Sequence, residues 1–379
     1  MKKQLTFILV ILVGILSFSA ISLDWGRLYQ MNGTQDSFFS VANGNGVYLI
    51  GSTNESGYDE NGLVANFDKN GELIGAPKTF GGDLSDWVTS AIINSDNELV
   101  AVGASNSFGS DFDYYISVFG DKNKSSYYKD FGNSKATSVV EVKNSYVVVG
   151  YSQDPKSLNY KGKIVKFDKD LNVLWERWLP FVKEGVDVKP LNVYKTSDNY
   201  LIITGVVVDY FKGKTELYIA KTTVDGVVIW NEVSPVKDYA RAFQSAELSD
   251  GYVVTGYTGT WKDKWSDIYL AKYSKDGKLL WEKTYGLENS DHGYAVTTYN
   301  NKIYIAGYLT TENKKDIVLM ELDNEGNELA NDIFGGSGDD VAYSVSADGM
   351  GSIYVSGYST SKDFGSDEKD LIVVKYSIK

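Results

Sequence analysis

The sequence predicts an all-β protein, a seven-bladed β-propeller of four-stranded antiparallel blades. Two observations lead to this prediction. Short runs rich in Tyr, Val, Ile and Thr alternate with glycine-containing polar segments, as expected for many strands joined by tight turns. In addition, a glycine recurs at the end of a strand-like run at intervals of 47 to 55 residues. The seven glycines are Gly51, Gly103, Gly150, Gly205, Gly256, Gly307 and Gly357.

Each of these glycines belongs to a larger unit of four runs, which we call strands A to D. Strand A is rich in small residues, as in 342–348, and strand B carries the glycine. A glycine inside a strand indicates a place where another backbone approaches closely. A polar loop then leads to strand C, as in 267–277, and a short turn to strand D, as in 279–286. Four short strands joined in this way predict one propeller blade.

The last two strands of the unit have their own signals. The turns between them contain DKNG, KDG or NEG, in which glycine supplies the positive φ of a hairpin. Strand D carries an aromatic residue in most units, and we expect these rings to wedge between neighbouring blades. They are Trp25, Tyr127, Trp175, Trp230 and Trp281.

The two ends of the chain are out of phase with the blade. The sequence finishes on a C strand, at 370–379, and a D strand at 23–30 follows the N-terminal segment. Trp25 and Tyr29 repeat the spacing of Trp281 and Tyr285, which identifies this run as a D strand. We therefore expect the N-terminal strand to complete the last blade and close the ring, which removes an exposed sheet edge.

The first residues are typical of a signal peptide. Lys2 and Lys3 precede an apolar run at 7–16, and small residues follow it. We expect residues 1–22 to hold the signal peptide, with cleavage after Ser19 or Ser22, and a single domain at 23–379. The protein would then be periplasmic, on the cell surface or secreted, with no stable membrane span. An uncleaved membrane anchor is the alternative interpretation.

Composition excludes several function classes. The formal net charge is −13, and the only arginines are Arg27, Arg177 and Arg241, which argues against nucleic acid as the main partner. The absence of cysteine excludes disulfides, thiolate metal sites and cysteine nucleophiles. We find no phosphate loop, nucleophile elbow or zinc motif, and therefore predict no cofactor and no metal site. The oligomeric state stays open.

Acidic residues precede several A strands, and they suggest two interpretations. A ring of carboxylates around the channel mouth would suit cation binding or glycosidase chemistry. Their repetition favours instead a role in building the blade, by accepting hydrogen bonds from loop backbone. These residues are Asp36, Asp86, Asp238, Asp291 and Asp340. The single histidine, His292, has no second histidine with which to build a site, so we expect a structural or solvent-exposed role.

The repeats also resemble those of a known family. The matching features are the glycines that end strand D (Gly81-Gly82, Gly335-Gly336), the GY or GS of strand B, and a strand C that runs from Asp267 to Lys272 or from Asp370 to Lys375. In these features the chain resembles the seven-bladed propeller repeats of bacterial secreted proteins. The resemblance implies export and no particular reaction. Tryptophan on strand D is loosely similar to quinoprotein-type propellers, although no cofactor site of that kind is identifiable.

Function is predicted from the loops. The connections at 104–113, 208–216, 259–267 and 359–370 are long and share one face, where binding usually resides. We predict an exported, non-catalytic binding or scaffold protein that takes a protein or glycan there, with an insertion at 181–190 forming one wall. The candidate ligand-binding residues are Tyr210, Phe211, Trp261, Trp265 and Asp263. The alternatives are a glycan-active hydrolase or lyase using the carboxylates above, and a structural envelope component.

Overall fold

The computed structural model describes residues 21–30, 34–54, 60–120, 122–180, 185–234, 238–260, 262, 265–366 and 368–378, without the side chains of 35–38. Nearly all of the regular structure in these ranges is β-strand, together with one short 3-10 turn at Lys362–Phe364. The predicted all-β class is confirmed. Across the described residues, we find no helix with the length and apolar character needed to cross a membrane.

The strands form five four-stranded sheets and one eight-stranded sheet, and nearly all neighbours in a sheet are antiparallel. The first sheets in the chain are β2 (Thr34–Asn43), β3 (Gly46–Asn54), β4 (Asn61–Asp68) and β5 (Lys78–Phe80); β6 (Asp86–Ile93), β7 (Leu99–Ser105), β8 (Asp113–Phe119) and β9 (Lys124–Tyr128); and β10 (Ser134–Glu141), β11 (Ser145–Gln153), β12 (Tyr160–Asp168) and β13 (Val173–Trp178).

The eight-stranded sheet repeats the same order twice. It contains β14 (Asp187–Lys195), β15 (Tyr200–Asp209), β16 (Lys214–Thr223) and β17 (Val228–Ser234), then β18 (Tyr239–Leu248), β19 (Gly251–Gly259), β20 (Ser266–Ser274) and β21 (Leu279–Tyr285). A single parallel bridge between Thr215 and Tyr239 joins the two halves. The next sheet holds β22 (His292–Tyr299), β23 (Lys302–Thr311), β24 (Lys314–Leu322) and β25 (Glu328–Phe334).

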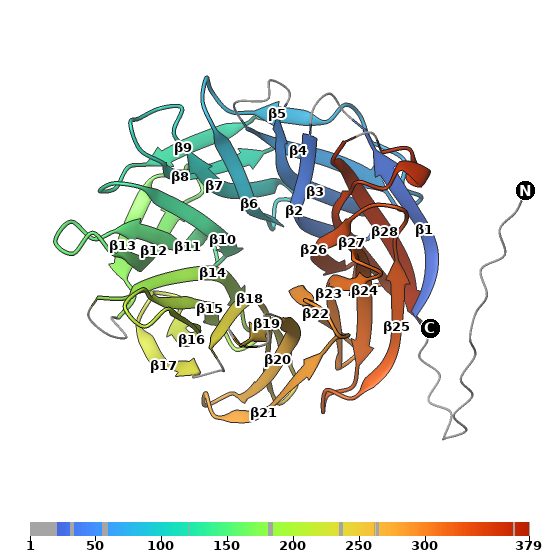
Figure 1. Cartoon of the computed structure of the whole chain (residues 1–379). Helices are drawn as coiled ribbons and strands as arrows, with labels where there is room; N and C mark the ends of the chain where they lie inside the picture. The colour runs from blue at the N-terminus through green and yellow to red at the C-terminus, as the bar shows by residue number, and fades with distance from the viewer. Residues whose placement is uncertain are drawn as a thin grey trace, which may run out of the picture.

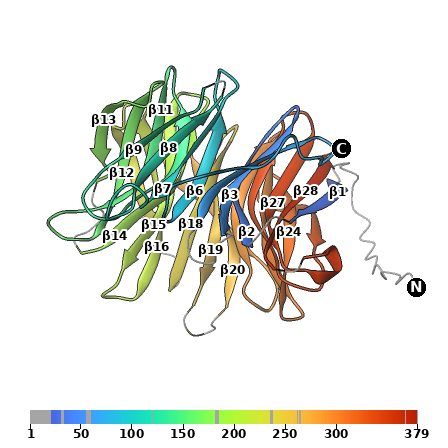
Figure 2. The ribbon, with the colours of Figure 1, turned by 90° about the horizontal axis from the view of Figure 1, so that it is seen from above.

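The remaining sheet brings the two ends of the chain together. It consists of β26 (Asp340–Ala347), β27 (Ser352–Ser359), β28 (Asp370–Ile378) and β1 (Ile21–Tyr29), with β1 on the outside. β1 pairs antiparallel with β28, from Ile21 opposite Ile378 to Tyr29 opposite Leu371, as expected from the sequence. Figure 1 shows the sheets arranged in a circle, with the blue β1 beside the red β28. Figure 2 shows β2 next to β27, where the first and last sheets of the chain meet.

The recurring glycine has a specific structural cause. In β2, β6, β10, β14, β18, β22 and β26, the innermost strands, the register shifts by one residue directly opposite this glycine. The β-bulge brings a carbonyl of the innermost strand against the glycine. A Cβ added at Gly256 would lie 1.7 Å from the Arg241 carbonyl oxygen, and one at Gly307 would lie 1.8 Å from that of His292. The prediction of a close backbone approach is confirmed.

The aromatic residues of the outer strands pack on the turn of the next sheet. Gly71 lies at φ 81°, and the ring of Trp25 covers it so closely that an added Cβ would be 3.0 Å away. Tyr29 donates a hydrogen bond to the Gly71 carbonyl oxygen. The same two contacts recur at Gly326. The ring of Trp281 covers this glycine, and the Tyr285 hydroxyl donates to its carbonyl oxygen at 2.7 Å. The predicted wedge between sheets is therefore present at the tryptophans, whereas the Tyr127 ring contacts Phe108 and Tyr115 of its own unit.

Two expected loops are largely strand. The insertion expected at 181–190 ends earlier, because β14 already begins at Asp187. Pro190 occupies the position before the bulge, opposite Gly205, where a missing N–H is tolerated. The loop expected at 208–216 is only the turn 210–213, since Val208 still pairs with Thr215. Residues 181–184 lie outside the described part of the chain.

Candidate functional site

The innermost strands surround a central channel. Two cavities, of about 260 and 330 Å³, occupy it. Both are lined by the residue that follows the bulge in five of these strands, so they meet at one layer and form a continuous channel. These shared residues are Phe39, Ser90, Ser138, Asn192 and Gln244. The bulged residues themselves face the first cavity: Thr89, Thr137, Leu191, Phe243, Tyr294 and Tyr343.

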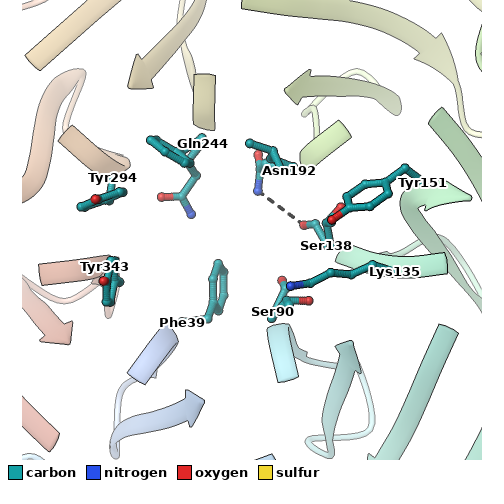
Figure 3. A pocket seen from close by; sticks show the side chains of 13 residues that line it. Phe39, Ser90, Lys135, Ser138, Tyr151, Asn192, Gln244, Tyr294 and Tyr343 are labelled. Carbon is teal, nitrogen blue, oxygen red and sulfur yellow. Dashed lines mark hydrogen bonds between the residues drawn. The ribbon is translucent and has the colours of Figure 1, made fainter. Parts of the chain in front are cut away.

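The first cavity has two chemically different walls. Phe39, Tyr294 and Tyr343 form an aromatic side, and Tyr294 contacts Tyr343 with their ring centroids 4.9 Å apart. Ser90, Ser138 and Lys135 form a polar side opposite them (Figure 3). The Lys135 side chain extends toward Ser90 at the edge of the cavity (Figure 3). The channel is therefore asymmetric, although the repeats that build it share one backbone plan.

Most polar groups of the wall already hold neighbouring strands together. The Asn192 Oδ1 accepts from the Ser245 N–H at 3.3 Å, and the Gln244 Oε1 accepts from the Val296 N–H at 2.8 Å. Thr89 donates to the Ala136 carbonyl oxygen at 2.9 Å, and Thr137 to that of Pro190 at 3.0 Å. Each bond joins the innermost strand of one four-strand unit to that of the next. These polar side chains therefore stabilise the contacts between neighbouring units, and few polar groups of the wall remain to bind a ligand.

The position two residues before the bulge forms a further layer of the channel. Side chains two apart in a strand share a face, so this layer lies next to the bulged residues, toward the end of the sheets where the innermost strands begin. Its members are Asp36, Trp87, Lys135, Lys189, Arg241, His292 and Val341. Three consecutive members are cations. We call this end of the sheets the loop face, because the connections from strand B to C and from strand D to A also lie there.

His292 lies in a cluster of tyrosines at this layer. Its ring stacks on Tyr257, with centroids 3.9 Å apart, and its nitrogens contact the Ser266 Oγ at 2.7 Å and the Tyr294 Oη at 3.1 Å. Burial and the positive charges of Lys315 and Arg241 lower the pKa of His292 to about 3. The imidazole is therefore neutral near pH 7, and it contributes packing and hydrogen bonds rather than charge.

The predicted carboxylates bond to the loops that precede and follow them. The Asp86 Oδ2 accepts from the Gly82 N–H at 2.8 Å and from the Ser107 hydroxyl at 2.7 Å. Asp340 accepts from the Gly336 N–H at 2.7 Å. Asp291 accepts the N–H of Leu287 and, at 2.7 Å, that of Thr310.

Burial raises the pKa of both Asp291 and Asp340, although the backbone donors oppose the rise. The other two predicted carboxylates are only partly described. Asp238 lies just before β18, and its N–H donates to the Gly259 carbonyl oxygen at 3.2 Å. Asp36 pairs with Ser52 in β2, and its side chain lies outside the described part.

The predicted loop aromatics that the structure describes are exposed. Phe211 is 92% exposed, Tyr210 64% and Trp265 51%. Tyr210 is oriented by a bond from its hydroxyl to the Asp187 Oδ2, at 3.0 Å. A Cβ added at Gly185 would lie 3.6 Å from Phe211, so Gly185 lies beside this ring. Trp261 and Asp263 lie outside the described residues.

Sequence reasoning expected a channel mouth but missed the residues that line the channel. Lys135, Phe39 and Tyr294 lie in strands that we describe as rich in small residues, and the bulge directs them inward. Aligning the innermost strands on the glycine's partner would have identified these residues, because they occupy fixed places relative to it. Lys135 lies one place before the partner, Tyr294 one place after it, and Phe39 two places after it.

Comparisons with known proteins support the fold alone. No family model matches the sequence, and no curated protein matches it. The WD40 propeller domain of Doa1 is similar in structure, with a TM-score of 0.56, 14% identity, and 95% of this chain and 97% of that chain covered. A protein of unknown function from Dyadobacter fermentans has a TM-score of 0.54 at 12% identity, covering 95% and 99%. Chaetomium thermophilum Sqt1, solved with the N-terminus of ribosomal protein L10, has a TM-score of 0.53 at 12% identity, covering 92% and 98%. The chain therefore has a β-propeller fold.

Proposed function

We propose that this chain is an exported, non-catalytic binding propeller that holds a protein partner on its loop face. The observation that carries the proposal is the exposure of Tyr210, Phe211 and Trp265 on that face. Large aromatic side chains dominate the binding energy of many protein interfaces, because they bury much area for little lost conformational entropy. A ring that is 92% exposed contributes little to the stability of its own fold.

We also propose that the sheets are seven blades of one closed ring, with the two chain ends sharing the last blade. Seven innermost strands with the same bulge support this proposal, as does the repeated four-strand order inside the eight-stranded sheet. The finer family likeness to bacterial secreted repeats is part of the same proposal, and it rests on the sequence features alone.

A protein partner is better supported than a glycan. Among structures of similar fold, Sqt1 was solved with the N-terminus of a ribosomal protein, and shared fold offers an analogy for the mode of binding. A glycan-active hydrolase is less well supported, since its candidate carboxylates Asp86, Asp291 and Asp340 are engaged by loop donors. A purely structural envelope role would leave the exposed aromatics without an occupant.

The absence of cysteine makes the proposal directly testable. A Phe211→Cys variant can carry a photoreactive maleimide at one defined site on the loop face, and Lys278→Cys carries it on the opposite face as the matched control. We expect cross-linking in an envelope extract to yield one discrete protein adduct from position 211 and none from 278, and we expect Trp265→Ala to reduce it. Equal labelling patterns at the two positions would reject a partner on the loop face.

Export has its own check. Cleavage after Ser19 would leave Ile21 and Ser22 to pair with Ile378 and Ser377, whereas cleavage after Ser22 would remove both pairs. We therefore expect the mature protein to begin at Ala20, as measured by the intact mass of protein from the native host. An intact Met1 in the membrane fraction would contradict the proposal.

A further inference from the structure

The cationic layer of the channel is unusual for this chain. The protein carries a formal net charge of −13 and three arginines. Arg27 and Arg177 lie on the outer strands β1 and β13, each over a tryptophan ring of its own strand. Arg241 alone lies on an innermost strand, at the register position that Lys135 and Lys189 occupy in the two preceding units. Three consecutive units of an acidic molecule thus place a cation at the same position of the channel layer.

Two of these cations have no counter-ion among the described side chains. The side chains of Lys135 and Arg241 make no ion pair or hydrogen bond with a residue that the structure describes, whereas Lys189 pairs with Asp187 at 3.0 Å. Burial lowers the pKa of Lys135, and the charge of Glu60 opposes this only in part. The Lys135 Nζ lies 4.8 Å from the centroid of the Trp87 ring and lines the first cavity. A partly buried ammonium without an anion is costly, and an anionic ligand would relieve that cost.

The cations act on the same small volume. Arg241 and Lys189 both lower the pKa of Tyr151, against a larger rise from burial, and Arg241 also acts on His292 and Tyr294. Tyr151 and Tyr294 line the cavity that Lys135 also lines (Figure 3). Arg241 and Lys189 therefore lie near Tyr151, which lines the same cavity as Lys135. Because the rest of the molecule is acidic, only a short anionic group can approach these cations without repulsion elsewhere.

We propose that the channel mouth binds a carboxylate side chain on a short acidic peptide segment of the protein partner, with Lys135 and Arg241 as its counter-ions. The inference rests on the proposed function and names the chemistry that the partner must carry. The volume of about 260 Å³ admits one or two side chains rather than a folded domain. A peptide suits the site better than an acidic saccharide, because Asn192, Gln244 and Thr137 are committed to bonds between strands and few groups remain to read sugar hydroxyls.

Binding of fluorescein-labelled hexaglutamate, followed by fluorescence anisotropy at low salt, tests this inference. The matched peptide is hexaglutamine, and the variants are the Lys135→Met/Arg241→Gln double mutant and Lys278→Gln, which removes an exposed lysine on the opposite face. We expect hexaglutamate to bind and hexaglutamine not to bind. The double mutant should bind at least about tenfold more weakly, the scale of one lost charged contact, and added salt should weaken the wild type. Lys278→Gln should match the wild type.

Several outcomes would overturn the inference. They are no binding of hexaglutamate, equal binding by the double mutant, or tighter binding of tetragalacturonate than of hexaglutamate, which would identify a saccharide site. Since the side chains of Lys135 and Arg241 make no hydrogen bond or ion pair with a described residue, we expect the double mutant to fold, which circular dichroism will verify. The cross-link from position 211 reports a partner whatever its charge. If position 211 captures a partner but hexaglutamate does not bind, this inference is wrong and the proposed function still stands. If hexaglutamate binds but position 211 captures no partner, the anion site stands and the proposed function is wrong.

Discussion

At the scale of single residues, the recurring glycine determines where the innermost strand bulges. We expect Gly256→Ala to destabilise the protein, because the new Cβ would meet the carbonyl oxygen of Arg241 at 1.7 Å and the Cα of Ala242 at 3.2 Å. Backbone atoms cannot move aside as a side chain can, so the strand must separate or lose its bulge. The expected loss in the free energy of unfolding is about 2–4 kcal/mol, measured by urea denaturation.

Gly109→Ala is the matched control for this prediction. The nearest atom to a Cβ there is the Asp113 Oδ2, at 3.2 Å, which is the end of a side chain and can rotate. We expect a change within about 1 kcal/mol. If both variants lost the same stability, the close approach at Gly256 would not be the cause.

His292 should give the protein a measurable dependence on pH. Its pKa is about 3 in the folded chain and near 6.5 in the unfolded chain, so the unfolded state takes up the proton first as pH falls. Its contribution to stability is thus full above pH 6.5 and lost progressively toward pH 3, by at most roughly 1.4 kcal/mol for each pH unit. Denaturation at neutral and mildly acidic pH should show a smaller loss in His292→Gln than in the wild type.

The imidazole resonances provide a second measurement of the same effect. Since the chain has one histidine, its NMR signal needs no assignment. We expect this signal to stay unshifted as pH falls through 6.5 in the folded protein. A normal titration would mean that the ring is solvated and that its stack on Tyr257 is loose.

Residues such as these also show what the sequence can predict. Gly256 was identifiable because its close backbone approach recurs in each unit and only glycine permits it. Lys135 and Phe39 were not, because their direction depends on a register shift, and a one-residue shift moves a side chain to the other face of a strand. No local pattern around Lys135 distinguishes a channel-facing lysine from a solvated one.

At the scale of elements, β1 is the strand whose removal should matter most. Deleting residues 21–30 leaves the β28 edge unpaired and removes Trp25 and Tyr29 from the turn at Gly71. We expect a loss of roughly 3 kcal/mol or more, comparable to truncating a large core aromatic, and a lower melting temperature. A deletion that ends at Ser19 serves as the control and should melt like the full chain. Equal melting of both deletions would contradict the role of β1.

Elements were predicted well where a repeat defines them and poorly where a proline interrupts the pattern. The outer strands β1 and β21 share the W-x-x-x-Y spacing, and both appear within two residues of their expected bounds. β14 begins earlier than expected because Pro190, which suggests a loop, lies at a bulge that requires no hydrogen bond from it. The loop aromatics were identifiable by composition alone, since Phe211 has no role in the strand pattern.

At the scale of the whole molecule, charge and shape act together. The overall acidity favours solubility and repels extended anions, while the loop face carries exposed rings together with the layer that holds Lys135, Lys189 and Arg241. The predicted binding face and the cationic layer that the sequence did not predict therefore lie at the same end of the sheets. A partner that inserts a side chain into the channel would also lie across Phe211.

The pairing of β1 with β28 also affects the order of folding. Each hairpin inside a sheet joins residues close in sequence, whereas Ile21 meets Ile378 across nearly the whole chain. Loop closure grows slowly with length, and a loop this long costs about 2 kcal/mol more than one spanning a single repeat. Because β1 is synthesised first and its partner β28 last, the pairing of β1 with β28 should be the slowest to form. A protein exported unfolded would complete its circle only after the C-terminus has crossed the membrane.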